Sequence, residues 1–133
     1  MQAGSKYAIV ADGAHGKSTI LKNLTDRKTA FVAAGIIKKQ IGRQTPVYTT
    51  QSFDVLLNDL TLEENLNYFV RLGSIHPRLA NQMVVAFGLY PSLHILVRNL
   101  NTSHKHLLML VLALTGSNRT VILDEPFTGL THD

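Results

Sequence analysis

The most constraining feature of the sequence is a Gly-Lys-Ser-Thr run that follows a short apolar segment. Gly16-Lys17-Ser18-Thr19 comes shortly after Tyr7-Ala8-Ile9-Val10, a run bounded by turn residues and typical of a buried strand. Residues 12–16 have the composition of a loop, and residues 17–24 have helical character. A strand, a loop and a helix in this order direct backbone N–H groups and a helix dipole towards one point, where Lys17 adds a full positive charge. The sequence therefore predicts a cradle for phosphate groups.

The predicted phosphate ligands are consecutive in the chain. They are Gly13, Ala14, His15, Gly16, Lys17, Ser18 and Thr19. Ser18 is also expected to place its hydroxyl group on Mg²⁺. The usual G-x-x-x-x-G-K-[ST] pattern has a first glycine where this chain has Ala11, and alanine at a position of positive φ costs on the order of 1 kcal/mol. We expect weakened nucleotide binding; a chance match at an ordinary helix start is the alternative.

A helical period replaces this pattern in the middle of the chain. Thr61 and Glu64 have the spacing of a capping box, and the residues after them place an apolar face on one helix. Pro77 and Gly88 are expected to begin and end a second helix. Residues from about 104 to 115 are apolar nearly all round, which predicts a buried helix. The apolar face of the first helix is Leu62, Leu66, Phe69 and Val70, and that of the second is Leu79, Met83 and Phe87.

Strand-like segments flank the helical middle. Residues 29–37, 46–50 and 120–123 are rich in residues that favour strands. This order of elements predicts an α/β sheet with a helical insertion rather than a plain alternation. Asp124 and Glu125 follow the last strand, where Asp124 can hold Mg²⁺ through water and Glu125 can orient or deprotonate an attacking water. A strand that ends in an acidic turn is the alternative.

These motifs resemble the nucleotide-binding domains of ATP-binding cassette (ABC) transporters, most closely those of subfamily A, the lipid transporter type. Residues 121–126, Val-Ile-Leu-Asp-Glu-Pro, resemble the Walker B segment, and residues 127–130 the start of the D-loop. Residues 48–51 and 60–66 resemble the Q-loop and the start of the helical subdomain. The resemblance implies a partial P-loop NTPase sheet with a helical subdomain insertion. Residues 1–60 and 104–133 would then form the RecA-like core, and residues 61–103 the helical subdomain.

The resemblance also implies a function. Gln51 would contact Mg²⁺ and the attacking water and would relay nucleotide state to the helical part, and Glu125 would serve catalysis. The chain would bind Mg-ATP and, in a dimeric sandwich with a second nucleotide-binding domain, hydrolyse it to drive transport by a transmembrane partner. It would lie at the cytoplasmic face of a membrane through that partner, since no run of about 18 apolar residues could span one.

The resemblance fails at the family signature L-S-G-G-x. Residues 100–104 read Leu-Asn-Thr-Ser-His, so side chains replace the glycines that let the opposite domain's nucleotide approach closely. Residues 1–133 contain no counterpart of the family's upstream aromatic residue or switch histidine, and Thr131 occupies the usual place of the D-loop aspartate. His104 and His106 are two apart on a helix and are expected to face different sides, so they predict no metal site.

The composition argues against several other classes of protein. The 133 residues include no cysteine, so a disulfide framework and a thiolate metal site are absent, and nothing at the amino end reads as a signal peptide. The net charge of +4 comes from scattered residues, so no nucleic acid partner is expected. Two functions stay open: an ABC-type ATPase domain, or a degenerate cassette that holds nucleotide, or nothing, and serves structurally. A more remote third is an unrelated P-loop kinase or GTPase.

Overall fold

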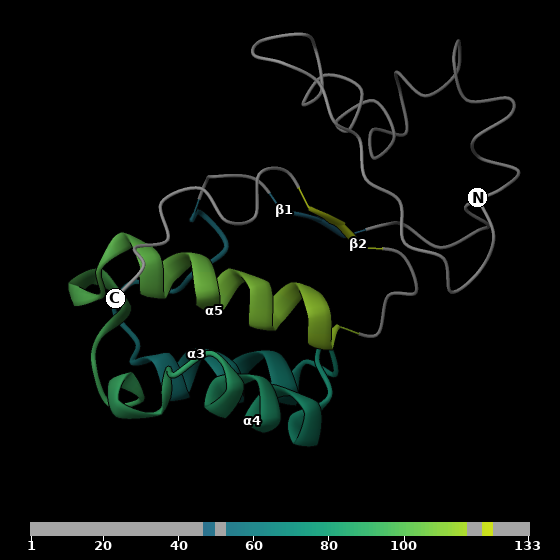
Figure 1. The fold of residues 1–133 in the computed structure, drawn as a ribbon, viewed down its shortest axis with the longest axis horizontal. Helices are drawn as coiled ribbons and strands as arrows, with labels where there is room; N and C mark the ends of the chain where they lie inside the picture. Colours follow the sequence, from purple (N-terminus) through teal and green to yellow (C-terminus); the bar gives the residue numbers. More distant parts are fainter. Residues whose placement is uncertain (1–46, 50–52, 117–120, 124–133) are drawn as a thin grey trace, which may run out of the picture. The chain divides into compact units, whose positions relative to one another are not determined.

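The computed structural model describes residues 47–49, 53–116 and 121–123 (Figure 1). Contacts within the chain separate a strand pair from a helical unit, and each is described by itself. The elements in chain order are β1 (Val47–Thr49), α3 (Leu62–Arg71), α4 (Pro77–Ala86), the 3₁₀ turns η1 (Tyr90–Ser92) and η2 (Val97–Asn99), α5 (Thr102–Thr115) and β2 (Val121–Leu123).

The strand pair confirms two predicted strands. β1 and β2 are hydrogen-bonded neighbours in a two-stranded sheet, although more than seventy residues separate them in sequence. Both consist of β-branched, aromatic and aliphatic residues, which suit a pleated surface. The other predicted elements of the core, at residues 7–10, 17–24 and 29–37, lie outside the described residues, as does most of the predicted sheet.

Helix α3 begins at the predicted capping box. The Thr61 hydroxyl oxygen accepts the N–H of Glu64 at 3.2 Å, and the Glu64 carboxylate accepts the N–H of Thr61 at 2.8 Å. Two N–H groups that the helix cannot pair internally are thereby satisfied. The predicted apolar face is confirmed, with Leu62 and Leu66 buried and the other two positions partly buried against the core. The local sequence therefore specifies where this helix begins.

Helix α4 begins at Pro77 and ends before Gly88, as predicted. Pro77 occupies the first helical position, where its missing N–H is not needed, and Gly88 adopts a φ of +67° that favours glycine. The prediction of its buried face was wrong, because the buried line of side chains lies one position further along the helix. Ala80 and Val84 are the buried pair, whereas Leu79, Met83 and Phe87 are only partly buried. The reason is that the i, i+4 line through Ala80 and Val84 is the centre of the core contact.

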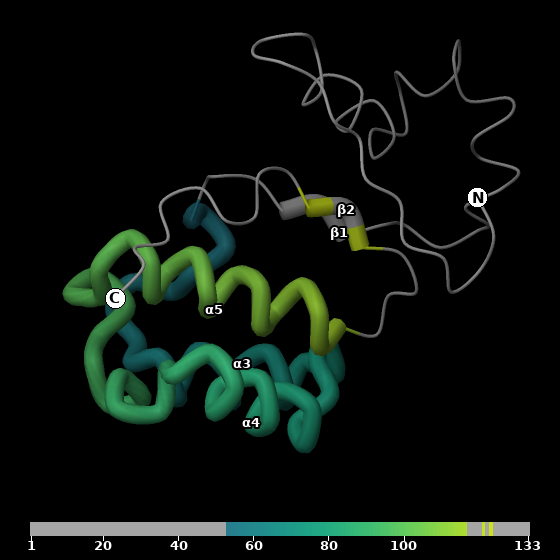
Figure 2. Tube along the Cα trace, viewed as in Figure 1, coloured from purple at the N-terminus to yellow at the C-terminus, as the bar shows by residue number. Residues whose placement is uncertain are grey.

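Helix α5 is the element on which the other two helices pack. It lies alongside α3 and α4 (Figure 2), and α4 makes the larger contact. Buried residues occur on more than one of its faces, as the all-round apolar sequence predicted. The helix starts at Thr102 rather than near residue 104, because the Asn101 side chain accepts the N–H of His104 and caps it. Its buried residues are Leu108, Leu110, Val111, Ala113 and Thr115.

A backbone contact fixes α4 to the end of α5. The N–H of His76, immediately before α4, donates to the carbonyl oxygen of Thr115 at 2.8 Å, and Ile75 forms an antiparallel bridge with Gly116. The start of α4 and the end of α5 are therefore held together. The assignment of residues 104–133 to the RecA-like core stays a prediction. Among the described residues, α5 packs against α3 and α4.

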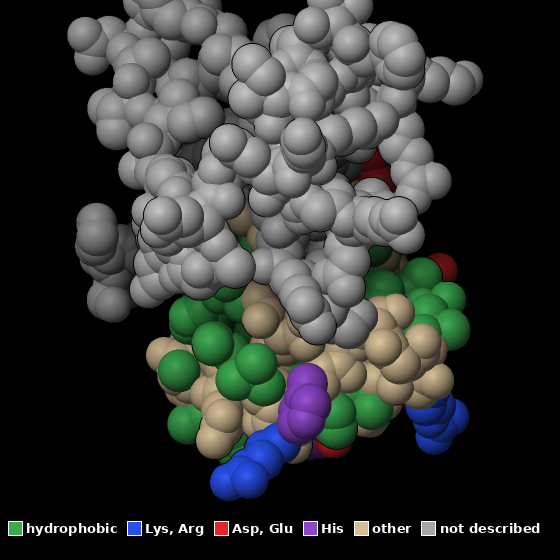
Figure 3. All heavy atoms as spheres, turned by 90° about the vertical axis from the view of Figure 1, so that its right-hand side faces the viewer, with side chains coloured by type: hydrophobic (Ala, Val, Ile, Leu, Met, Phe, Trp, Pro, Cys, Tyr) green, Lys and Arg blue, Asp and Glu red, His purple; other side chains and the backbone are tan. Residues whose placement is uncertain are grey.

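The surface of the helical unit is mixed in character. On the face drawn in Figure 3, hydrophobic side chains are interspersed with polar atoms and with a few charged and histidine side chains. Large exposed hydrophobic residues come from several segments, among them Leu72, Val85 and Tyr90. Within the described ranges, no helix has the length and apolar character needed to cross a membrane.

The buried stripe of α5 predicts a large stability difference between two leucines on the same helix. Leu108→Ala should lower the free energy of unfolding by about 2–5 kcal/mol, because the side chain is fully buried in the core shared by the three helices. Leu114→Ala is the matched control, since Leu114 is 38% exposed and should cost clearly less. Urea unfolding followed by circular dichroism measures both; equal losses would contradict the packing described above.

The capping box predicts an acid-sensitive contribution to stability. The hydrogen bond from the Thr61 backbone, followed by that from its side chain, lowers the pKa of Glu64 below its ordinary value of 4.5. A lowered folded-state pKa contributes stability that is fully present above pH 4.5 and is lost as the pH falls through the folded value. The difference in unfolding free energy between wild type and Glu64→Gln should therefore shrink on acidification below pH 4.5. A difference that does not change with pH would contradict this role.

Candidate functional site

The predicted nucleotide and metal ligands lie outside the described residues. They are Gly13, Ala14, His15, Gly16, Lys17, Ser18, Thr19, Gln51, Asp124 and Glu125. The strands that lead to the last three are described: β1 ends two residues before Gln51, and β2 ends directly before Asp124. These two strands pair with each other. The roles of the ligands themselves stay predictions, and the described part of the site is the amino end of α5 with the segments around it.

The amino end of α5 carries its own hydrogen-bond acceptor. The Asn101 side-chain oxygen accepts the N–H of His104 at 2.7 Å, and the Asn101 carbonyl oxygen accepts the N–H of Lys105 at 3.1 Å. Free N–H groups at a helix start are what make it attractive to anions. Here one of them is already bound by a side chain. The segment at the signature position thus presents a capped helix and no glycine.

The two histidines of α5 face different partners, as the sequence predicted. Nδ1 of His104 lies 3.2 Å from the hydroxyl oxygen of the buried Ser92, in η1. The ring of His106 meets the ring of Phe53 edge-on, with centroids 4.8 Å apart. Among the described residues, no group of three or more histidine, cysteine or acidic side chains could hold a metal ion. These imidazoles therefore connect α5 to neighbouring segments of the protein.

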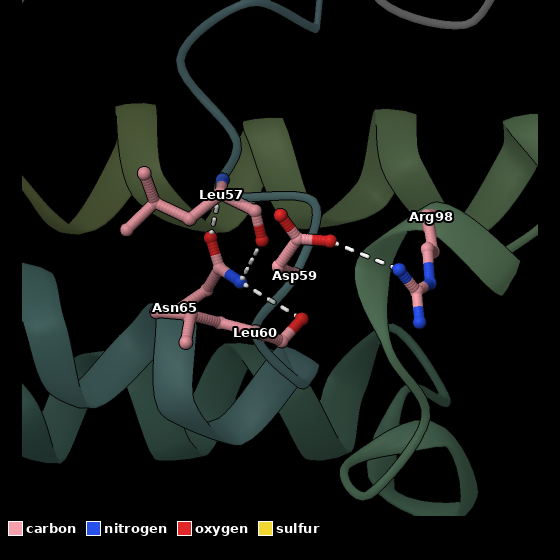
Figure 4. A network of polar contacts seen from close by, with 5 residues as sticks. All are labelled: Leu57, Asp59, Leu60, Asn65 and Arg98. Atoms are coloured by element: carbon pink, nitrogen blue, oxygen red, sulfur yellow. Dashed lines mark hydrogen bonds and ion pairs between the residues drawn. The ribbon is translucent and has the colours of Figure 1, made fainter.

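The segment between β1 and α3 is organised around one buried amide that sequence reasoning missed. The Asn65 side chain, fully buried on α3, makes four hydrogen bonds to the backbone of residues 57–61 (three of the groups that it contacts are drawn in Figure 4). Its oxygen accepts the N–H of Leu57 at 2.9 Å. A sequence signal was present, since Asn65 interrupts the apolar face that Leu62 and Leu66 define. A polar residue in such a position calls for partners inside the fold.

The same segment pairs on its other side with the chain that precedes α5. The N–H of Val97 donates to the carbonyl oxygen of Leu60 at 2.9 Å, and that of Arg98 donates to Asn58 at 3.1 Å. The Arg98 guanidinium group also lies 3.0 Å from the carboxylate of Asp59 (Figure 4). Both side chains of this ion pair are largely exposed, so solvent screens it and the backbone bonds are the stronger tie.

Comparisons with known proteins agree with the motifs. A family model described as "ABC transporter" matches residues 1–128. The phospholipid-transporting ATPase ABCA3 of Mus musculus is 34% identical over 98% of this chain, and that of Homo sapiens is 32% identical over the same share. The ABC transporter A family member 9 of Dictyostelium discoideum is 32% identical over 92%. The chain spans only 8% of the length of the two ABCA3 proteins and 16% of the Dictyostelium protein.

The family match includes the Gly-Lys-Ser-Thr run, the segment before and after Gln51, and the strand β2 that ends directly before Asp124. The fold implied by this family is the α/β P-loop type, of which the described residues provide one strand pair and the helical unit. The helical unit lies between the two strands in sequence, at the position where the resemblance predicted an insertion. The chain belongs to the ABC transporter family, as an ATP-binding domain whose relatives include members of subfamily A.

Proposed function

We propose that this chain binds Mg-ATP through residues 13–19 and works as the ATP-binding part of an ABC-type transporter. The observation that carries the proposal is the Gly-Lys-Ser-Thr run at residues 16–19, within a family match that covers residues 1–128. Backbone N–H groups of the loop and the ammonium group of Lys17 would hold the β- and γ-phosphates. Ala11 would weaken this binding without abolishing it.

The remaining predicted ligands have the chemistry that a magnesium nucleotide needs. Ser18, Gln51 and Asp124 offer hydroxyl, amide and carboxylate oxygens, and Mg²⁺ prefers oxygen ligands. When bound, the ion neutralises phosphate charge. Glu125 would orient or deprotonate the attacking water, and Gln51 would help to position it. In sequence, Gln51 and Glu125 each follow by two residues one of the two strands that pair, which supports these assignments.

The proposal includes partners and a location. A second nucleotide-binding domain would complete a dimeric sandwich, and a transmembrane domain would couple ATP turnover to transport at the cytoplasmic face of a membrane. Two of the relatives are phospholipid-transporting ATPases by name, which supports a lipid as the transported class. This chain would supply energy to such a protein, and the transported molecule would be bound elsewhere.

A degenerate cassette is the second candidate, and one observation favours it. At the position of the family signature, the Asn101 side chain already binds the N–H of His104, and threonine and serine replace the glycines. A nucleotide phosphate held by an opposite domain would have to displace Asn101 and pass these side chains. In this second reading the chain holds nucleotide, or serves structurally, without efficient hydrolysis.

Nucleotide binding is tested by removing the lysine. Lys17→Ala should weaken the binding of a fluorescent ATP analogue about 10- to 100-fold, because a charge-assisted hydrogen bond to phosphate is lost. Lys38→Ala removes the same charge outside the motif and should leave the titration unchanged. Superimposable curves for wild type and Lys17→Ala would refute the phosphate cradle.

Hydrolysis separates the two candidates. If the chain is an active ATPase part, the full chain with Mg-ATP releases phosphate above background, and Glu125→Gln lowers the rate about 10²- to 10⁴-fold through loss of the general base. The degenerate cassette instead predicts background release by both proteins while the Lys17-dependent binding persists. Phosphate release measured with and without magnesium provides the readout, and release that Glu125→Gln leaves unchanged would refute the catalytic role.

A further inference from the structure

We propose that Asn65 is a positioning residue that joins two segments, residues 57–61 and residues 95–98, into one rigid unit. The chain enters this unit shortly after Gln51 and leaves it shortly before the amino end of α5. The resemblance implies that Gln51 relays nucleotide state to the helical part, and the unit would carry a displacement at Gln51 to α5. That consequence rests on the proposed function, whereas the rigid unit itself does not.

The hydrogen-bond partners around the Asn65 side chain match the acceptor and the donors of an amide in this orientation. Its oxygen faces one backbone N–H, that of Leu57, and its nitrogen faces the carbonyl oxygens of Leu57, Leu60 and Thr61 at 3.0, 3.4 and 2.9 Å. An amide offers one acceptor and two donor hydrogens at this reach, which matches one N–H and several carbonyl groups. Because Asn65 is fully buried, loss of the amide would leave the N–H of Leu57 without its acceptor. The three carbonyl oxygens would each keep one backbone donor and lose the second contact that ties them to the side chain on α3.

The opposite side of residues 57–61 is bound by a second set of backbone contacts. Thr61 forms an antiparallel bridge with Leu96, and the N–H of Leu62 donates to the carbonyl oxygen of Ile95 at 3.0 Å. Together with the hydrogen bonds from the N–H groups of Val97 and Arg98, these contacts join residues 58–62 to residues 95–98. Leu60 is in contact with both sides, since its carbonyl oxygen accepts from Asn65 and from Val97. Residues 57–61 are thus held between α3 and the segment that precedes α5.

The unit connects to α5 over a short distance in sequence. The turn η2 (Val97–Asn99) follows it, and the N–H of Leu100 donates to the carbonyl oxygen of Val97 at 3.1 Å. The next residue is Asn101, the cap of α5. No residue between the unit and this helix is without regular structure, because residues 96 to 100 lie in the bridge, in η2 or at its ends. Movement of residues 57–61 would therefore be transmitted directly.

The other end of the unit is anchored close to Gln51. Phe53, two residues after Gln51, packs against the core, and its ring contacts that of His106 on α5. The N–H of Leu56 donates to the carbonyl oxygen of Phe53 at 2.9 Å, which closes a turn before the unit begins. The chain after Gln51 is thus attached to α5 twice, once through an aromatic contact and once through the unit that Asn65 holds.

Amide hydrogen exchange of the full chain without nucleotide tests the rigid unit. In the wild type, the amides of Leu57, Val97 and Arg98 should exchange through one opening event, with the same dependence on denaturant. Asn65→Ala should raise exchange in residues 57–61 and 95–98 together, by at least about tenfold, through loss of the four Asn65 side-chain hydrogen bonds. Asn67→Ala is the matched control, since Asn67 is exposed on the same helix. Different opening energies in the wild type, or a rise in one segment alone, would overturn the proposal.

Exchange in α4 shows whether the variant is folded. Residues 80–86 should keep their protection in Asn65→Ala, because Asn65 has no hydrogen bond to α4. If α4 also loses protection, the comparison is made with Asn65→Asp. That variant keeps the side-chain volume and the acceptor for Leu57 but loses the donors. Joint exposure of the two segments supports the unit, and wild-type exchange in either of them overturns it.

A measurement with Mg-ATP tests the consequence for function. In the wild type, nucleotide should change the exchange of His104 and Lys105 at the start of α5. Asn65→Ala should bind the fluorescent ATP analogue within about twofold of wild type, yet lose this response. A merely structural residue would leave the response intact in the folded fraction, and that result would overturn the positioning role. If the wild type shows no Lys17-dependent binding, the proposed function fails and the coupling with it, while exchange without nucleotide still decides the rigid unit.

Discussion

The packing of α3 and α4 against α5 is the constraint on which the helical unit depends. Leu108 and Val111 are fully buried at this contact, and each side chain of this size contributes about 1.5–3 kcal/mol by leaving water. Both ends of α5 are also fixed by hydrogen bonds, through Asn101 at the start and through Thr115 to the chain before α4. The position of the amino end of α5 is therefore set by the core and by its neighbours. A functional contact at the amino end of α5 would therefore be made by a firmly held part of the structure.

Features that depend on neighbouring residues were predictable from the sequence. The capping box at Thr61 and Glu64, and the stop at Gly88, act within a few residues, and the structure has them where the pattern placed them. The buried face of α4 was predicted one residue away, because hydrophobicity does not say which of two adjacent lines meets a partner helix. Asn65 was missed for a related reason. Its partners are backbone groups of an irregular segment, and no sequence period describes them.

The candidate site also has parts that local sequence motifs predict and parts that they do not. Residues 13–19 and the pair Asp124 and Glu125 were predicted from local motifs, and their roles remain predictions because they lie outside the described residues. The start of α5 could not be placed correctly from the sequence. The apolar period suggested residue 104, whereas the cap that fixes the start is a polar residue three positions earlier. A cap is a contact between a side chain and a specific N–H, and composition alone does not reveal it.

The capped end of α5 concerns one of the two nucleotide contacts that the resemblance implies for each domain. In the arrangement that the resemblance implies, each domain binds one nucleotide through its own P-loop and faces the other nucleotide with its signature segment. A change at residues 100–104 would then affect the partner's nucleotide, while binding by residues 13–19 would stay intact. Replacing an N-cap side chain costs a helix about 1 kcal/mol, so a phosphate that displaces Asn101 must recover at least that much. Under the proposed function, nucleotide binding by this chain would therefore depend on residues 13–19, whereas hydrolysis by a pair that includes it would depend on residues 100–104 as well.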